Sequence, residues 1–328
     1  MIDRRDFMFA LGAAAFSVPE AVFAQAKPGV ARVGRLSPLS KATDERNREA
    51  LIDGLRELGW IEGKNLQMEY RFADGHEERH AELAKELARS GVNVIVAGST
   101  PGALAVKQAT SKIPVVIVTT GDPVANGLVK SLAHPGSNVT GVTALTQELG
   151  GKRLEVFAEV IPGIKQMAVL ANHMSPDTKP SLDGVRSSAK ALGIKLTVLE
   201  ARDTAGIESA FATLERERAK ALMVLQHPMF VTQQKLIVQS AARARLPAMY
   251  PLHEFVSAGG LLFYGVDLPE MYRRAATYVD KLLKGAKPGD LPVEQPTKFE
   301  LVVNMKAATT LGIRFPNSIL VRADKVIE

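Results

Sequence analysis

From about residue 31 onward, short apolar runs alternate along the chain with longer segments of helical periodicity. The runs are rich in Val and Ile, and several are apolar throughout, which is typical of strands buried on both faces of a sheet. In the longer segments apolar residues recur every three or four positions, as at Leu51, Leu55 and Leu58. This alternation predicts parallel sheets with crossover helices, the doubly wound α/β class.

The alternation occurs twice, so the chain predicts two architectural repeats, each able to build its own sheet. In the first half we expect strands at 31–36, 65–72, 93–97, 114–119 and 139–143, and helices at 44–58, 77–89, 101–110 and 124–133. In the second half we expect strands at 167–171, 195–200, 221–225, 247–250 and 261–266, and helices at 177–192, 207–216 and 230–243.

The C-terminal segment of about sixty residues is too long to serve only as a cap on the second sheet. They predict a helix at 269–283, a Pro- and Gly-rich stretch at 285–296, a strand at 299–304 and a helix at 305–311. We therefore expect the chain to pass between the lobes more than once, at 143–149, 266–269 and 291–297. These crossings would form a three-segment hinge between lobe 1 (27–143 plus about 267–291) and lobe 2 (144–266 plus about 297–328).

Residues 1–26 have the pattern of a signal peptide. The apolar run at 7–18 is shorter than the roughly 20 residues of a membrane-spanning helix, and small residues follow it up to Ala24 and Ala26. Arg4 and Arg5 resemble a twin-arginine export signal, with the general secretory route and a signal anchor as the alternatives. We expect cleavage near Ala24 or Ala26 and release into the periplasm.

With 328 residues, of which 46% are hydrophobic and 23% charged, the chain can build two separate cores. There is no cysteine, which excludes disulfides, thiolate metal sites and lipid attachment through an N-terminal Cys. Its 41 basic and 35 acidic residues are spread along the chain, so the formal charge of +6 does not predict nucleic-acid binding.

Several short motifs, specific only in combination, resemble one known family across essentially the whole mature chain. They are GLRELGW at 54–60, IPVV at 113–116, GDPV at 121–124, PGSNVTG at 135–141, AGGL at 258–261, LLKGAKP at 282–288 and LPVEQPT at 291–297. These motifs resemble the periplasmic substrate-binding components of ABC importers of the tryptophan/tyrosine-uptake type, within the type I periplasmic-binding-protein fold. The resemblance implies capture of a small solute, delivery to a membrane permease with its ATPase, and no cofactor. An amino acid or an aromatic carboxylate is the candidate solute, and we expect a monomer.

In open α/β sheets ligands bind beyond the carboxyl ends of the strands. In the first half, Gly98, Ser99 and Thr100 follow one such strand, and Thr120 and Asp122 follow the next. We interpret Thr100 and Asp122 as helix N-caps, and we expect the loop at 98–100 to bind a carboxylate at the positive end of a helix. For each of these residues the alternative to ligand binding is an ordinary helix-capping role.

Other polar or aromatic residues stand at strand ends in both halves. Ser37 follows the first strand; Asn172, His173, Gln226, Tyr250 and Tyr264 stand at or near strand ends in the second half. The amides suit an amino acid or amide solute, and the tyrosines could stack on a flat ligand. At each position the alternative to ligand binding is a structural role, either as a loop residue that forms its hydrogen bonds locally or as an aromatic residue of the core.

No sequence motif of a hydrolase, a Walker loop, a zinc protease or a dinucleotide fold occurs in the right context, so we expect no enzyme activity. His76 and His80 have the i, i+4 spacing at which two His side chains could coordinate one metal ion. We interpret them instead as residues on the solvent-exposed face of a helix and expect no metal site. An enzyme on the same scaffold and a receptor for a signalling partner remain alternatives. A transcription-factor effector domain is nearly excluded, because a signal peptide stands where its DNA-binding segment would be.

Overall fold

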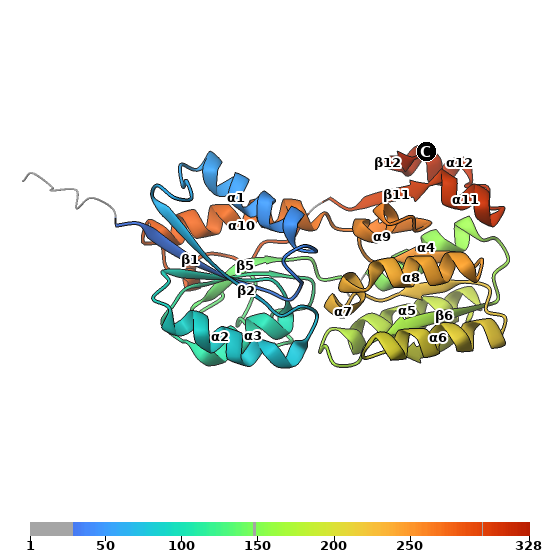
Figure 1. The fold of residues 1–328 in the computed structure, drawn as a ribbon, viewed down its shortest axis with the longest axis horizontal. Helices are drawn as coiled ribbons and strands as arrows, with labels where there is room; N and C mark the ends of the chain where they lie inside the picture. The colour runs from blue at the N-terminus through green and yellow to red at the C-terminus, as the bar shows by residue number, and fades with distance from the viewer. Residues whose placement is uncertain (1–28, 147–148, 297) are drawn as a thin grey trace, which may run out of the picture.

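The computed structural model describes residues 29–146, 149–296 and 298–328, which build two lobes side by side (Figure 1). The expected signal peptide, residues 1–26, lies outside the described part. Each lobe is a parallel or mainly parallel sheet flanked by helices, which confirms the α/β prediction. No helix in the described ranges combines the length and the apolar content that a membrane crossing needs.

The first lobe contains a five-stranded parallel sheet with the strand order β2-β1-β3-β4-β5. Its strands are β1 (Ala31–Ser37), β2 (Leu66–Phe72), β3 (Val94–Ala97), β4 (Val115–Thr119) and β5 (Val139–Thr143). Because the order reverses beside β1, the loops after β1 and β3 diverge to opposite faces and leave a crevice between them. That crevice faces the second lobe.

Helices α1 (Glu45–Glu57) and α10 (Leu268–Leu283) pack together on one face of this sheet, and α2 (His80–Arg89) and α3 (Thr100–Ala109) cover the other (Figure 1). Gly54 allows the close approach of α1 and α10, because a Cβ there would lie 2.8 Å from the Cβ of Ala276. A helix from late in the sequence therefore completes the core of the first lobe.

The second lobe contains a seven-stranded sheet with the order β12-β11-β10-β9-β8-β6-β7, in which only the β10–β11 pair is antiparallel. Its strands are β6 (Gln166–Ala171), β7 (Lys195–Glu200), β8 (Leu222–Val224), β9 (Ala248–Tyr250), β10 (Leu262–Gly265), β11 (Glu300–Asn304) and β12 (Lys325–Ile327). Its helices are α4 (Leu149–Val160), α5 (Thr178–Leu192), α6 (Thr204–Arg216), α7 (Pro228–Thr232), α8 (Gln234–Arg243), α9 (His253–Ser257), α11 (Met305–Leu311) and α12 (Asn317–Arg322).

The chain passes between the lobes after β5, after β10 and before β11 (Figure 1). The last passage is paired to the first, because Thr143 N donates to Glu294 O at 2.9 Å and Glu294 N donates to Gly141 O at 2.9 Å. Near the second passage the buried Arg153 donates to the carbonyl oxygen of Tyr264 at 2.7 Å. Burial lowers the pKa of Arg153 to about 10.

Two predicted helices are wrong in detail. Residues 124–133 form turns instead of a helix, since Asp122 Oδ1 accepts hydrogen bonds from Val124 N and Ala125 N and Gly127 takes a left-handed φ of 68°. The segment 230–243 is broken at Gln233 into α7 and α8. Helix α12 and strand β12 were not predicted from the sequence.

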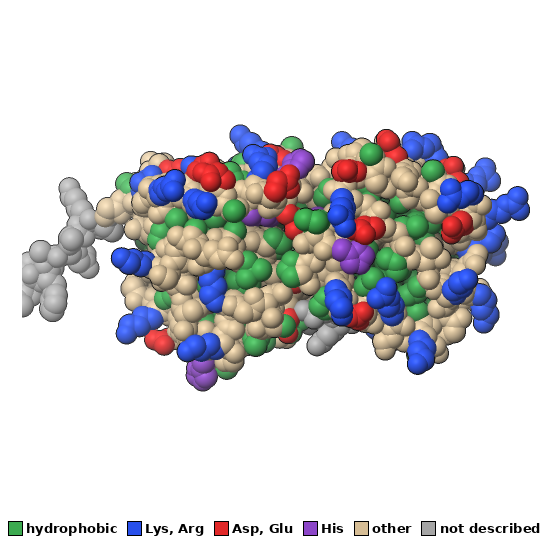
Figure 2. Space-filling view, turned by 90° about the horizontal axis from the view of Figure 1, so that it is seen from below, with side chains coloured by type: hydrophobic (Ala, Val, Ile, Leu, Met, Phe, Trp, Pro, Cys, Tyr) green, Lys and Arg blue, Asp and Glu red, His purple; other side chains and the backbone are tan. Residues whose placement is uncertain are grey.

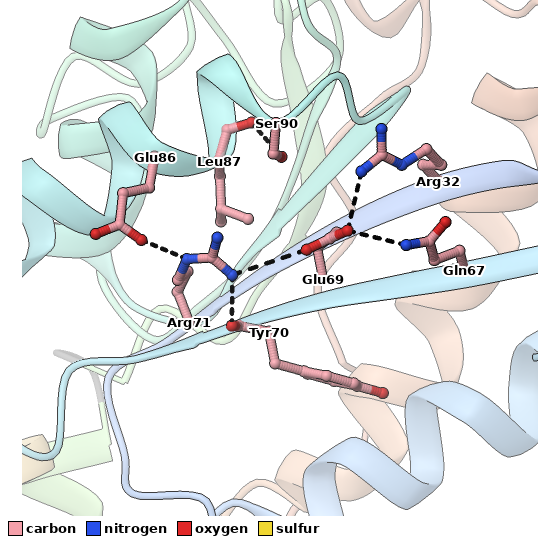
Figure 3. A network of polar contacts seen from close by, with 8 residues as sticks. All are labelled: Arg32, Gln67, Glu69, Tyr70, Arg71, Glu86, Leu87 and Ser90. Atoms are coloured by element: carbon pink, nitrogen blue, oxygen red, sulfur yellow. Dashed lines mark hydrogen bonds and ion pairs between the residues drawn. The ribbon is translucent and has the colours of Figure 1, made fainter.

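Charged side chains line the outer edge strand of the first sheet, β2 (Figure 3). Glu69 accepts from Arg32 at 2.9 Å, and Arg71 Nε donates to Glu86 at 2.6 Å. Such partly exposed pairs add about 0–1 kcal/mol each. Their main effect is to charge an edge that would otherwise invite pairing with another strand.

Candidate functional site

A narrow cleft of about 60 Å³ lies between the lobes at the carboxyl ends of β1, β3, β4, β6 and β8. Its lining combines hydroxyl, amide and carboxyl groups with apolar side chains from both lobes. Lys and Arg side chains are scattered over both lobes on the face shown in Figure 2, mixed with Asp and Glu. Because both lobes line this cleft, a small ligand bound in it would touch both of them.

The loop after β3 lines the cleft with Gly98, Ser99 and Thr100, as predicted for strand ends. The N-cap of α3 is Ser99, whose Oγ accepts from Gly102 N at 3.1 Å, so the prediction that Thr100 is the cap was wrong. Thr100 is the first helical residue instead. Its buried hydroxyl has no well-aligned hydrogen-bond partner among the described residues but lies near the Asp177 carboxylate of the second lobe.

The loop after β4 brings Thr120 to the cleft but not Asp122. The Thr120 carbonyl accepts from both the backbone N and the Oγ1 of Thr146, at 2.7 and 2.9 Å. Asp122 caps a turn instead of a helix and points its carboxylate at backbone N–H groups of that turn. Local capping therefore accounts for Asp122.

In the second lobe, Gln226 lines the cleft, and its buried Oε1 has no partner among the described residues. Asn172 does not line the cleft. Its Oδ1 accepts a hydrogen bond from Met174 N at 2.9 Å and so stabilises the loop that contains Asn172. His173 is 39% exposed and faces Glu200 at 3.7 Å. Of these three predicted residues, only Gln226 is brought to the cleft.

Three further predicted residues lie outside the cleft lining. Tyr250 is a core residue stacked on Phe255, with ring centroids 5.1 Å apart, and burial raises the pKa of its hydroxyl. Tyr264 packs near Phe299 beside the passages between the lobes. The hydroxyl of the buried Ser37 accepts from the backbone N of its neighbour Leu39 at 3.1 Å.

Asp177 is a cleft residue that sequence reasoning missed, although it stands just before α5 in the position of a helix cap. Its side chain does not cap the helix; its Oδ1 accepts from Asn126 Nδ2 of the first lobe at 2.9 Å. Burial raises the pKa of the Asp177 carboxyl, while the nearby Thr100 hydroxyl and the Asn126 amide oppose that shift. Gly121 leaves room for this carboxylate, since a Cβ there would lie 1.9 Å from Oδ1.

Tyr272 and Asn47 also line the cleft, supported by a buried ion pair beneath them. Arg35 and Asp44 bind each other through contacts of 2.6–3.0 Å, and the Arg35 guanidinium lies 4.0 Å from the centroid of the Tyr272 ring. Burial raises the pKa of Tyr272 to about 12. Asn47 donates to Asp44 at 3.3 Å, and its Oδ1 has no partner in the described part of the chain.

His76 and His80 do not share a solvated face. His76 is exposed, whereas His80 is buried against the Glu77 carbonyl, and burial lowers the pKa of its ring. No group of three or more His, Asp or Glu residues that could hold a metal ion is found in the described ranges.

Comparison with known proteins identifies the family. The family described as "ABC transporter substrate binding protein" matches residues 32–327, and the chain belongs to it. A curated relative, a tyrosine-binding protein of Clostridioides difficile (strain R20291), is 24% identical over 270 residues, which cover 82% of this chain and 77% of the relative. The protein is thus a solute-binding component of an ABC transporter and not an enzyme, and it belongs to an extracytoplasmic family that serves an ABC permease.

Solved structures agree with this assignment. A conserved domain protein of Vibrio cholerae is 30% identical with a TM-score of 0.85, covering 90% of this chain and 99% of that one. An ABC domain of Streptococcus pneumoniae in complex with L-Trp is 26% identical with a TM-score of 0.83 and the same coverage. A ligand-free, open substrate-binding protein of Clostridium difficile is 23% identical with a TM-score of 0.65, covering 91% and 99%.

Proposed function

We propose that the chain captures an α-amino acid with a large apolar side chain between its lobes and delivers it to the permease. The observation that carries this proposal is the pairing of Asp177 from one lobe with the N-terminus of α3 from the other across a single cleft. A zwitterion needs both, because an acidic group meets its ammonium and a helix N-terminus meets its carboxylate. The tyrosine-binding relative and the L-Trp complex support the same ligand class.

The charges of the cleft favour a ligand with a cationic end. Among the described residues that line it there is no Lys, Arg or His, so Asp177 has no lining cation as partner. Asn47 Oδ1 and Gln226 Oε1 are further acceptors without a partner in the described structure. An ammonium group supplies three N–H donors and would satisfy acceptors of this kind.

The remaining lining suits an apolar body. Pro38, Leu39, Val231, Leu252 and Leu268 surround the cleft together with the Tyr272 ring. An aromatic or large aliphatic side chain would gain roughly 25 cal/mol for each Å² that this surface removes from water.

The three passages predicted from the sequence, of which residues 147, 148 and 297 lie outside the described residues, would act as the hinge about which the lobes close on the solute. The arrangement described here is a closed one, since polar contacts such as Asn126–Asp177 join the lobes across the cleft. A ligand that contacts both lobes favours closure by its differential affinity for that state.

Calorimetric titration with L-tryptophan, L-tryptophanamide and indole-3-propionate tests the proposal. The amide lacks the carboxylate and the propionate lacks the ammonium, so each should bind at least tenfold more weakly than the amino acid. Equal binding of all three would contradict recognition of both charged ends. If none of the three ligands binds, the solute is of another class.

Export is a separate part of the proposal. The mature protein would start at Gln25 or Lys27 after cleavage of the twin-arginine-type signal and would act in the periplasm as a monomer with a permease and its ATPase. Intact-mass measurement of the exported protein tests the cleavage site. A soluble cytoplasmic product that keeps residues 1–24 would contradict it.

A further inference from the structure

A buried polar contact joins the lobes beside the cleft. Glu77 starts a 3₁₀ turn (Glu77–Arg79) in the first lobe, and His227 is the N-cap of α7 in the second. His227 Nε2 and Glu77 Oε1 lie 3.0 Å apart, with the two side chains only 2% and 13% exposed. The ring N–H is not aligned for a hydrogen bond, and neither atom has another partner in the described structure.

The local structure fixes which face of His227 meets Glu77. Its Nδ1 accepts from Met229 N at 3.2 Å, so Nε2 is the ring nitrogen that faces Glu77. The backbones are in close contact at the same place, since a Cβ on Gly75 would lie 3.2 Å from the Cα of Met229. Both side chains are thereby shielded from water while the lobes are in contact.

A second contact on the other side of the boundary provides a comparison. Arg46 of α1 lies 3.2 Å from His253 Nδ1 and 3.9 Å from Glu254 of the second lobe, but its side chain is 56% exposed. Exposed pairs of this kind contribute little. The Glu77–His227 contact is therefore the stronger candidate to hold the lobes together.

We propose that Glu77 and His227 form a latch that stabilises the closed state and slows release of the solute. His227 stands between Gln226 and Pro228, both of which line the cleft, so the loop that would touch the solute also positions the latch. When the lobes open, both groups return to water. The latch therefore acts on the closing equilibrium and not on the fold of either lobe.

Cross-linking tests the latch without any solute. Arg46→Cys and His253→Cys, outside the cleft lining, should be joined by a short bis-maleimide faster in the closed than in the open arrangement, in a chain that has no native cysteine. Against this background, Glu77→Ala and His227→Asn should each slow cross-linking about tenfold. Asn keeps the N-cap of α7 but cannot reach Glu77.

The matched control is Glu78→Ala, because Glu78 lies in the same turn but is exposed, and its one partner among the described residues is His76. It should cross-link like the parent, and the double variant at 77 and 227 should be no slower than either single variant. Equal rates for the parent, Glu77→Ala and His227→Asn would overturn the latch. L-tryptophan should accelerate cross-linking of the parent; a failure there counts against the proposed solute and leaves the latch result standing.

Discussion

The two walls of the cleft are built on the same kind of sheet but carry different chemistry. The first lobe presents the N-terminus of α3 with Ser99 and Thr100, and the second presents the Asp177 carboxylate and the Gln226 amide. Each wall alone resembles an ordinary set of strand-end loops. On the proposed function, only their approach creates a site with a positive and a negative end, which would couple binding to closure.

The largest expected effect comes from removing the negative end. Asp177→Asn should weaken binding of L-tryptophan by about a hundredfold, because it removes the charge that faces the ammonium. It keeps an acceptor for the Asn126 contact. Calorimetric titration measures the loss, and affinity within threefold of wild type would place the ammonium elsewhere.

The same variant carries a pH signature. Because burial raises the pKa of Asp177, the folded protein holds this proton to higher pH than the unfolded chain, and stability falls as pH rises through that window. Solute-free Asp177→Asn should escape this loss and melt at or above the wild-type temperature near neutral pH. Wild-type affinity for L-tryptophan should decline as pH falls through the raised pKa, whereas a parallel decline in the variant would exclude Asp177 as its cause.

Ligand binding at the N-terminus of α3 can be tested separately from helix capping. Thr100→Val removes a hydroxyl without altering the cap and should weaken binding about tenfold with unchanged stability. Ser99→Ala removes the cap of α3 and should cost about 1 kcal/mol of stability. Thermal unfolding and titration of both variants distinguish the two. A loss of stability with full affinity for Thr100→Val would reverse the assignment.

Closure itself can be blocked from the first wall. Gly121→Ala would place a methyl group against the Asp177 carboxylate, so it should weaken binding several-fold while leaving the open protein folded. Small-angle scattering with L-tryptophan should then show less compaction than in wild type. Gly29→Ala, which meets no neighbour, is the control. Full compaction of Gly121→Ala would show that the lobes close differently.

The smallest effect should come from Tyr250→Phe. Tyr250 is buried in the second core and is absent from the cleft lining, so affinity should stay within twofold of wild type. A larger loss of affinity would indicate that Tyr250 contacts the ligand.

The two walls also differ in how much of them could be predicted from the sequence. Most strands and the loop at 98–100 were predictable, because apolar runs and N-cap residues are local signals. Asp177, Tyr272 and Asn47 were not, since they reach the cleft only when α5, α10 and α1 are placed in three dimensions. Tyr250 and His173 stand at strand ends too, but packing turns one into the core and the other toward Glu200.

A crystal structure of the mature protein grown with L-tryptophan tests the central claim most directly. The account predicts the ligand between closed lobes, its ammonium within hydrogen-bond distance of Asp177 and its carboxylate at the N-terminus of α3. A ligand bound in the opposite orientation, or bound outside the cleft, would contradict it.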